Sequence, residues 1–212
     1  MSAGALSSAL DALGQFAAKR RTVEHCELCA AVLEADHPHL ADPKTRRLVC
    51  ACPACALLFS SQDGAKYKRV PRRIRFLSDF HLTDADWESL MIPINMAFFF
   101  KSSPDGRVVA QYPSPAGATE SQLSLDTWND LALENPALTE MEPDVEALLV
   151  NRLGPGRGYT TNEHYIVPID ECYKLVWLIR STWQGFSGGT EVWDKLEEFF
   201  ADLQARAEAR YA

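Results

Sequence analysis

The spacing of apolar residues along the chain predicts a helix near each end. Between residues 3 and 21, leucines and a phenylalanine recur at three- and four-residue intervals and a basic cluster follows them, as in an amphipathic helix. After Thr190, six apolar residues fall on one helical face: Val192, Trp193, Leu196, Phe199, Phe200 and Leu203. Two shorter helices are predicted inside the chain, over residues 83–90 and 125–133.

Shorter apolar runs between these helices predict an antiparallel sheet. The runs 92–101 and 107–112 are joined by a Pro-Asp-Gly sequence, which is typical of a β-hairpin. Two further strands are predicted over residues 145–151 and 165–169. The run 172–183 fits neither period clearly, and its Val176, Trp177 and Ile179 favour a strand. This mixture predicts an α+β fold with helices flanking an antiparallel sheet.

Five of the six cysteines lie within 30 residues and form two closely spaced pairs. Two residues separate Cys26 from Cys29, and two separate Cys52 from Cys55. One tight turn lets such a pair present two sulfurs to one ion, and two pairs together suit Zn²⁺ or a single iron ion. We therefore predict that these four cysteines bind one metal ion, in a module that resembles a zinc ribbon or a rubredoxin.

Three neighbouring residues leave the ligand set open. Cys50 could replace one of the four cysteines, bind a second ion or remain a free thiol. His37 and His39 could complete a set of three cysteines and one histidine, form a second site or belong to an ordinary polar turn. A closed four-thiolate site has no position for a substrate, so zinc in it would be structural, whereas iron would carry electrons.

Charge divides the chain into modules with different surfaces. The net charge is −8, yet residues 1–78 hold 12 Lys or Arg against 7 Asp or Glu, and the remainder is strongly acidic. We predict an N-terminal helix over residues 1–24, a cysteine-rich module with a basic linker over 25–75 and an α+β domain over 76–212. The six cations of the stretch 66–75 could attract an acidic protein partner. The acidic second module argues against nucleic-acid binding.

The sequence predicts no membrane span. Its longest apolar run, from Met96 to Phe100, is far shorter than the roughly 20 residues that a helical span needs. The basic residues near the N-terminus follow the apolar stretch, which is opposite to the order in a signal peptide. We therefore expect a cytoplasmic protein, whose clustered cysteines bind metal rather than form disulfides.

No combination of residues points to a catalytic site. Cys172 directly follows Asp170 and Glu171, whose charges would raise the pKa of its thiol and oppose reactivity. We expect Cys172 to be a buried structural residue, and the protein to act by binding rather than by catalysis.

Five segments carry a resemblance to one bacterial family: residues 26–29 (CELC), 48–52 (LVCAC), 112–121 (YPSPAGATES), 143–152 (PDVEALLVNR) and 168–173 (PIDECY). Over about residues 25–203, the chain resembles proteins encoded beside the high-affinity, hydrogen-scavenging nickel–iron hydrogenases of soil bacteria. The resemblance implies an accessory role in hydrogenase maturation, assembly or electron transfer. It also places the five clustered cysteines at the family's cysteine positions and His39 at its histidine.

Two hypotheses follow for the function. In the first, structural zinc supports a protein that docks onto hydrogenase subunits or maturation factors. In the second, the cysteines hold rubredoxin-like iron and the protein transfers electrons to or from the hydrogenase. The sequence contains no separate cofactor-binding motif, which favours the first hypothesis.

Overall fold

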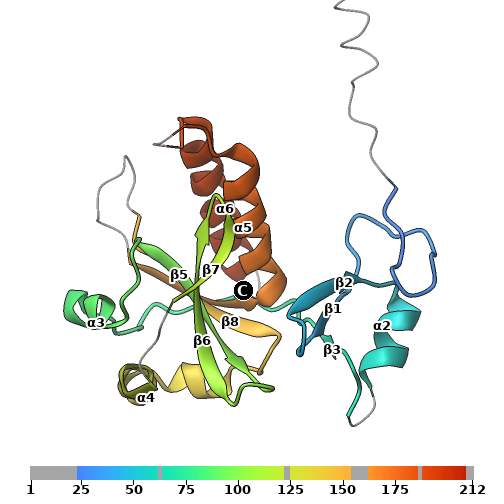
Figure 1. The fold of residues 1–212 in the computed structure, drawn as a ribbon, viewed down its shortest axis with the longest axis horizontal. Coiled ribbons are helices and arrows are strands. Elements are labelled where there is room, and N and C mark those ends of the chain that lie inside the picture. Colours follow the sequence, from blue (N-terminus) through green and yellow to red (C-terminus); the bar gives the residue numbers. More distant parts are fainter. Residues whose placement is uncertain (1–22, 62–63, 122–124, 154–161, 186–187, 209–212) are drawn as a thin grey trace, which may run out of the picture.

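A small module and a larger domain lie side by side in the computed structural model (Figure 1), which describes residues 23–61, 64–121, 125–153, 162–185 and 188–208. The N-terminal helix predicted over residues 1–24 lies almost entirely outside these residues. Within the described ranges, no helix is long and apolar enough to cross a membrane.

The small module is a three-stranded antiparallel sheet with one helix. The strands β1 (His39–Asp42), β2 (Arg47–Cys50) and β3 (Lys68–Arg69) lie in the order β2-β1-β3, and helix α2 (Pro53–Ser60) follows β2. In the β1–β2 hairpin, His39 pairs with Cys50 and Asp42 pairs with Arg47. The few buried apolar residues of this module surround the cysteines, so its own core is small: Cys26, Leu33, Leu40, Val49, Ala51, Cys55 and Ala56.

The larger domain is built on a six-stranded antiparallel sheet in the order β4-β9-β8-β5-β6-β7. Its strands are β4 (Arg75–Phe76), β5 (Met96–Ser102), β6 (Arg107–Ser114), β7 (Gly117–Ser121), β8 (Glu146–Asn151) and β9 (Glu163–Pro168). The predicted hairpin is confirmed as β5 and β6, and Gly106 adopts the positive φ of +62° that its turn requires. The strands predicted over residues 145–151 and 165–169 are confirmed as β8 and β9.

Helices cover both faces of this sheet, so its central strands are buried on both sides. Helices α5 (Ile169–Thr182) and α6 (Glu191–Glu208) pack on one face, where Phe98 and Phe100 of β5 point. Helices α3 (Asp84–Ser89) and α4 (Leu125–Glu134), with the 3₁₀ helix η1 (Pro136–Glu140), lie towards the other face, where Ala97 and Phe99 point. The structure thus confirms the α+β class with an antiparallel sheet and flanking helices.

The strand predicted over residues 172–183 is wrong, because this segment belongs to helix α5. Its buried residues recur with helical spacing, and they are Ile169, Cys172, Leu175, Val176 and Ile179. Trp177 is 68% exposed, which a helix permits but the interior of a sheet would not. Packing of this apolar face against α6 and the sheet outweighs the β-propensity of the branched residues.

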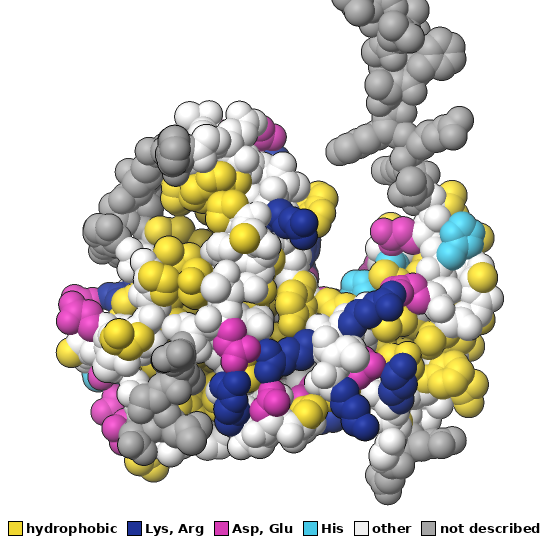
Figure 2. All heavy atoms as spheres, viewed as in Figure 1, with side chains coloured by type: hydrophobic (Ala, Val, Ile, Leu, Met, Phe, Trp, Pro, Cys, Tyr) yellow, Lys and Arg dark blue, Asp and Glu magenta, His cyan; other side chains and the backbone are white. Residues whose placement is uncertain are grey.

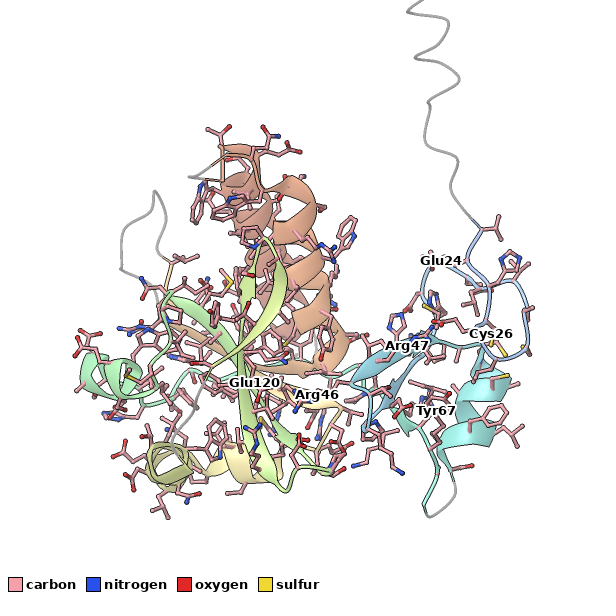
Figure 3. All side chains as sticks on the ribbon, viewed as in Figure 1. Glu24, Cys26, Arg46, Arg47, Tyr67 and Glu120 are labelled. Atoms are coloured by element: carbon pink, nitrogen blue, oxygen red, sulfur yellow. The ribbon has the colours of Figure 1, made fainter. Side chains whose placement is uncertain are left out.

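Charged pairs join the small module to the larger domain. Arg46, in the β1–β2 turn, donates hydrogen bonds to Asp105 at 2.6 Å and to Glu120 of β7 at 2.9 Å (Figure 3). Lys68 contacts Asp144 at 2.6 Å. Figure 2 shows basic and acidic side chains alternating across this junction.

The basic stretch 66–75 contributes much of this junction. Arg73 donates two hydrogen bonds to the fully buried Glu146, and Arg75 pairs with Glu140 at 2.7 Å. Val70 and Ile74, between these cations, are buried in the core of the larger domain. Three cations of the stretch, Lys68, Arg73 and Arg75, therefore hold the two parts of the chain together, while Lys66, Arg69 and Arg72 remain exposed on the surface.

Candidate metal centre

The structure brings together the four cysteines of the two predicted pairs. The sulfurs of Cys26, Cys29, Cys52 and Cys55 all lie within 4.8 Å of one another. Cys26 and Cys55 are buried, Cys52 is half-buried and Cys29 is exposed, so the cluster lies at the edge of the small core. Among the described residues, no cysteine forms a disulfide.

A tight turn presents the first pair. The Cys26 carbonyl accepts a hydrogen bond from the Ala30 amide at 2.8 Å, and the Cys26 amide donates to the Ala31 carbonyl at 2.8 Å. Ala30 closes the turn with a positive φ of 62°. The chain therefore reverses directly behind Cys29, and both sulfurs face the same point.

The second pair occupies the start of helix α2. Strand β2 ends at Cys50, and two residues later Cys52 is the N-cap of the helix, with Pro53 in its first turn. The Cys55 amide lies 3.5 Å from the Cys52 sulfur and donates to it. The positive end of the helix dipole favours negative charge on sulfurs in this position.

The spacing of the sulfurs fits a tetrahedral metal ion. Cys29 Sγ and Cys52 Sγ are 3.7 Å apart. Zinc–sulfur bonds of about 2.3 Å place two thiolates of a tetrahedron about 3.8 Å apart. The four residues therefore match the donor set of a Zn²⁺ or iron tetrathiolate site, and the Cys29–Cys52 distance matches its size; the metal's identity does not follow from this geometry.

The electrostatics of the cluster are compatible with a bound cation. Burial disfavours the Cys26 thiolate, but backbone amides of Cys52, Leu28 and Cys29 outweigh it and lower the Cys26 pKa to about 6. Burial, followed by the neighbouring thiols, raises the pKa of Cys55 to about 12. Four thiolates at these distances repel one another, and a divalent ion removes that repulsion.

Cys50, His37 and His39 form a separate group beside this cluster. One donor atom from each lies within 4.8 Å of the other two. Burial, followed by the Glu27 and Glu24 carboxylates, raises the pKa of Cys50, so its thiol keeps a proton until a cation displaces it. The structure places none of these three in the four-cysteine group.

Sequence reasoning missed two residues that orient this group. Asp170 of helix α5 accepts a hydrogen bond from His39 at 2.7 Å, and this contact raises the pKa of His39. Glu27 accepts a hydrogen bond from the Cys50 amide at 2.9 Å. Asp170 is 131 residues from His39, so no local pattern marks the contact, whereas Glu27 stands inside the first cysteine pair.

Cys172 is buried, as predicted, and lies in the core of the larger domain. Burial, with Asp170 and Glu171 in support, raises the pKa of its thiol well above the ordinary value. A protonated, inaccessible thiol neither binds metal nor attacks a substrate.

Comparison with known proteins identifies a family. No curated protein and no solved structure matches the chain. A family model described as "Family of unknown function (DUF5947)" matches residues 25–207, which include both cysteine pairs and nearly all of the larger domain. The chain therefore belongs to the DUF5947 family, whose function is unknown.

Proposed function

We propose that this chain is a metal-binding accessory protein, in which one zinc ion at Cys26, Cys29, Cys52 and Cys55 stabilises a small docking module. The observation that carries the proposal is the group of four sulfurs within 4.8 Å of one another. The resemblance to proteins encoded beside nickel–iron hydrogenases supports hydrogenase subunits or maturation factors as the partners.

The surroundings of the cluster support a structural role for the ion. Four cysteine ligands complete a tetrahedron and leave no position for a substrate. The apolar core around them contains seven buried residues, two of which are the cysteines themselves. A core of this size stabilises few folds unaided, and metal binding supplies the missing free energy.

Helix α2 offers a surface for the partner. Its Leu57 and Leu58 are 63% and 61% exposed, and Phe59 beside them is 41% exposed. Figure 2 shows apolar side chains gathered on the outer side of the small module. Contiguous exposed apolar side chains commonly mark protein contacts. Because the same helix begins with two of the four cysteines, metal binding would hold this surface in shape.

The partner is tested with the tagged full-length chain, recovered from cells that express the hydrogenase. We expect hydrogenase subunits or maturation factors to be enriched in quantitative mass spectrometry, and the double substitution Leu57→Ser/Leu58→Ser to abolish that enrichment. Leu133→Ser is the matched control, because Leu133 is 80% exposed on helix α4 of the other domain. Equal enrichment in both variants would refute docking through α2.

Rubredoxin-like electron transfer is the second candidate. One observation favours it: Cys29 is exposed, so an iron ion at this site would lie close to the surface and to a redox partner. Metal analysis and visible absorption separate the two functions, because ferric tetrathiolate iron is strongly coloured and zinc is colourless. We expect one zinc ion at the four cysteines, whereas iron that bleaches reversibly on reduction would assign the protein to electron transfer.

A further inference from the structure

His37, His39 and Cys50 meet where the β1–β2 hairpin begins and ends. His39 is the first residue of β1 and pairs directly with Cys50, the last residue of β2, so their side chains lie on the same face of the sheet. His37 precedes His39 by two residues, and the two imidazole rings lie 4.9 Å apart, edge to face. The hairpin register therefore brings three donor side chains to one point.

Hydrogen bonds fix which nitrogen each imidazole offers. His37 Nδ1 lies 2.8 Å from the Glu34 carbonyl oxygen, which can only accept, so Nδ1 carries the proton. His39 Nδ1 lies 2.7 Å from an Asp170 carboxylate oxygen. In both rings Nε2 is then the nitrogen available to a metal. Histidines that bind metals commonly have their second nitrogen held in this way by a carbonyl or a carboxylate.

The free nitrogen of His37 lacks a partner. The His37 side chain is 6% exposed, and its Nε2 is buried without a hydrogen bond in the described part of the chain. Such an atom loses its hydrogen bonds to water on folding and makes none within the protein. This lowers the folding free energy gained unless another group binds the atom. A metal ion between His37, His39 and Cys50 would satisfy it.

Cys50 lies next to the four-cysteine centre but belongs to a different group of donor atoms. The Glu27 carboxylate accepts a hydrogen bond from the Cys50 amide, and the Glu27 amide donates one to the Cys50 carbonyl at 2.9 Å. These bonds hold Cys50 at the end of the strand, before the chain turns at Ala51 into helix α2. Cys50 and Cys52 therefore serve different groups although only one residue separates them.

A cleft of about 750 Å³ lies beside the two histidines. It runs between the small module and helix α5, and its other walls include Arg72, Lys174 and Arg206. Cys50 is not among the residues that line it. An ion held by His37, His39 and Cys50 would have the cleft on its fourth side, where water or a small ligand could complete a tetrahedron.

We propose that His37, His39 and Cys50 bind a second divalent metal ion of the zinc class, with its fourth coordination position open to this cleft. Imidazole and thiolate donors select such ions over Mg²⁺ and Ca²⁺. An ion with three protein ligands is held less tightly than one with four thiolates, so the second ion should leave first. The proposal depends neither on the identity of the first ion nor on the partner protein.

The experiment measures zinc bound per chain, by mass spectrometry of the metal, after full-length protein is equilibrated with excess Zn²⁺ and freed of unbound ions. We expect two ions per chain in the unmodified protein, and one after mild chelation. His37→Ala, His39→Ala and Cys50→Ser should each bind one ion, and retention of that ion with an unchanged circular dichroism spectrum shows that the variant is folded. His25→Ala is the control, since His25 is an exposed histidine of the same module outside the group.

Cobalt replaces zinc to identify the ligands directly. Co²⁺ bound to a thiolate gives sulfur-to-cobalt absorption, so filling of the second site should add absorption that Cys50→Ser lacks and His25→Ala keeps. A single ion that all three variants retain would overturn the proposal. Loss of that single ion in Cys50→Ser, with the histidine variants unaffected, would also overturn it and would assign Cys50 to the first centre. If the four cysteines do not bind the first ion, Cys26→Ser will keep its full metal content. This result would refute the first metal site without bearing on the second.

Discussion

Replacement of Arg73 by alanine tests how the basic stretch 66–75 stabilises the protein. Arg73 lies between the small module and β4, and its Nε donates to Glu146 Oε1 at 2.6 Å while a second guanidinium nitrogen donates to Oε2 at 3.0 Å. The Glu146 side chain is 0% exposed. Within the described part of the chain, one further hydrogen bond reaches this carboxylate, from the Glu142 amide at 2.9 Å. Arg73→Ala therefore leaves a buried carboxylate without its cation.

The magnitude follows from this burial. Removal of one partner from a buried ion pair costs about 3–5 kcal/mol of folding free energy. The Arg73 side chain is 44% exposed, so water replaces part of its contact, and we expect a loss at the lower end, about 3 kcal/mol. Arg72→Ala is the matched control, because Arg72 and its partner Asp36 are both exposed. That variant should lose less than about 1 kcal/mol.

Urea unfolding of the metal-saturated protein measures both losses. In a chain of this size, about 3 kcal/mol corresponds to a melting temperature lower by roughly 6–12 °C. A further Glu146→Gln substitution in the Arg73→Ala background should recover part of the loss, because it removes the buried charge. Equal and small losses for Arg72→Ala and Arg73→Ala would refute the reasoning, and would make the basic stretch available to an acidic partner again.

Three further predictions concern the metal, the pH dependence and two glycines of positive φ. Cys52→Ser should lose the first ion and unfold the small module, because structural zinc binding is worth about 10 kcal/mol in small domains; metal analysis and circular dichroism check this. Burial, with a contribution from Arg152, lowers the pKa of His164 to about 4, below the value near 6.5 in the unfolded chain. The unfolded chain therefore takes up a proton first as the pH falls, so about 2 kcal/mol of stability should be lost between pH 7 and pH 5, and His164→Phe should remove that part of the slope in urea titrations. Gly188→Ala should cost about 2–3 kcal/mol, because φ is +86° and the new Cβ would lie 2.8 Å from Val192 Cγ1. Gly106→Ala, with φ of +62° and open space around it, should cost only about 1 kcal/mol in the same thermal melts.

The features that short-range patterns encode were predicted correctly. The Pro-Asp-Gly turn, the short helix predicted over residues 83–90 and the final helix all depend on residues within a few positions of one another. The two cysteine pairs are also encoded locally, because a spacing of two residues by itself directs both sulfurs to one side of a turn. That these cysteines bind a metal ion stays a prediction.

The features that depend on distant packing were missed. Strand β7 has little alternation of apolar and polar residues. It forms because its five residues pair with the edge of β6. Helix α5 contains β-branched residues, and only its contact with α6 and the sheet decides its conformation. The start of α2 did carry a local signal, because Pro53 follows Cys52 at a position that proline favours in the first turn of a helix.

The place of β4 in the sheet links metal loss to self-association. β4 is an edge strand of two residues, which pair with Tyr165 and Ile166 of β9, and it directly continues the segment that leaves the small module. If the module unfolds when its metal is removed, β4 keeps its contacts with the larger domain, through the buried Ile74 and the pair of Arg75 with Glu140, but loses the ordered chain that precedes it. A two-residue strand supported on one side only opens more readily, and where it opens β9, whose central residues are fully buried, presents its unpaired backbone at the edge of the sheet. Such an edge recruits strands from other chains, so removal of the metal should produce oligomers in a concentration-dependent manner before the larger domain itself unfolds.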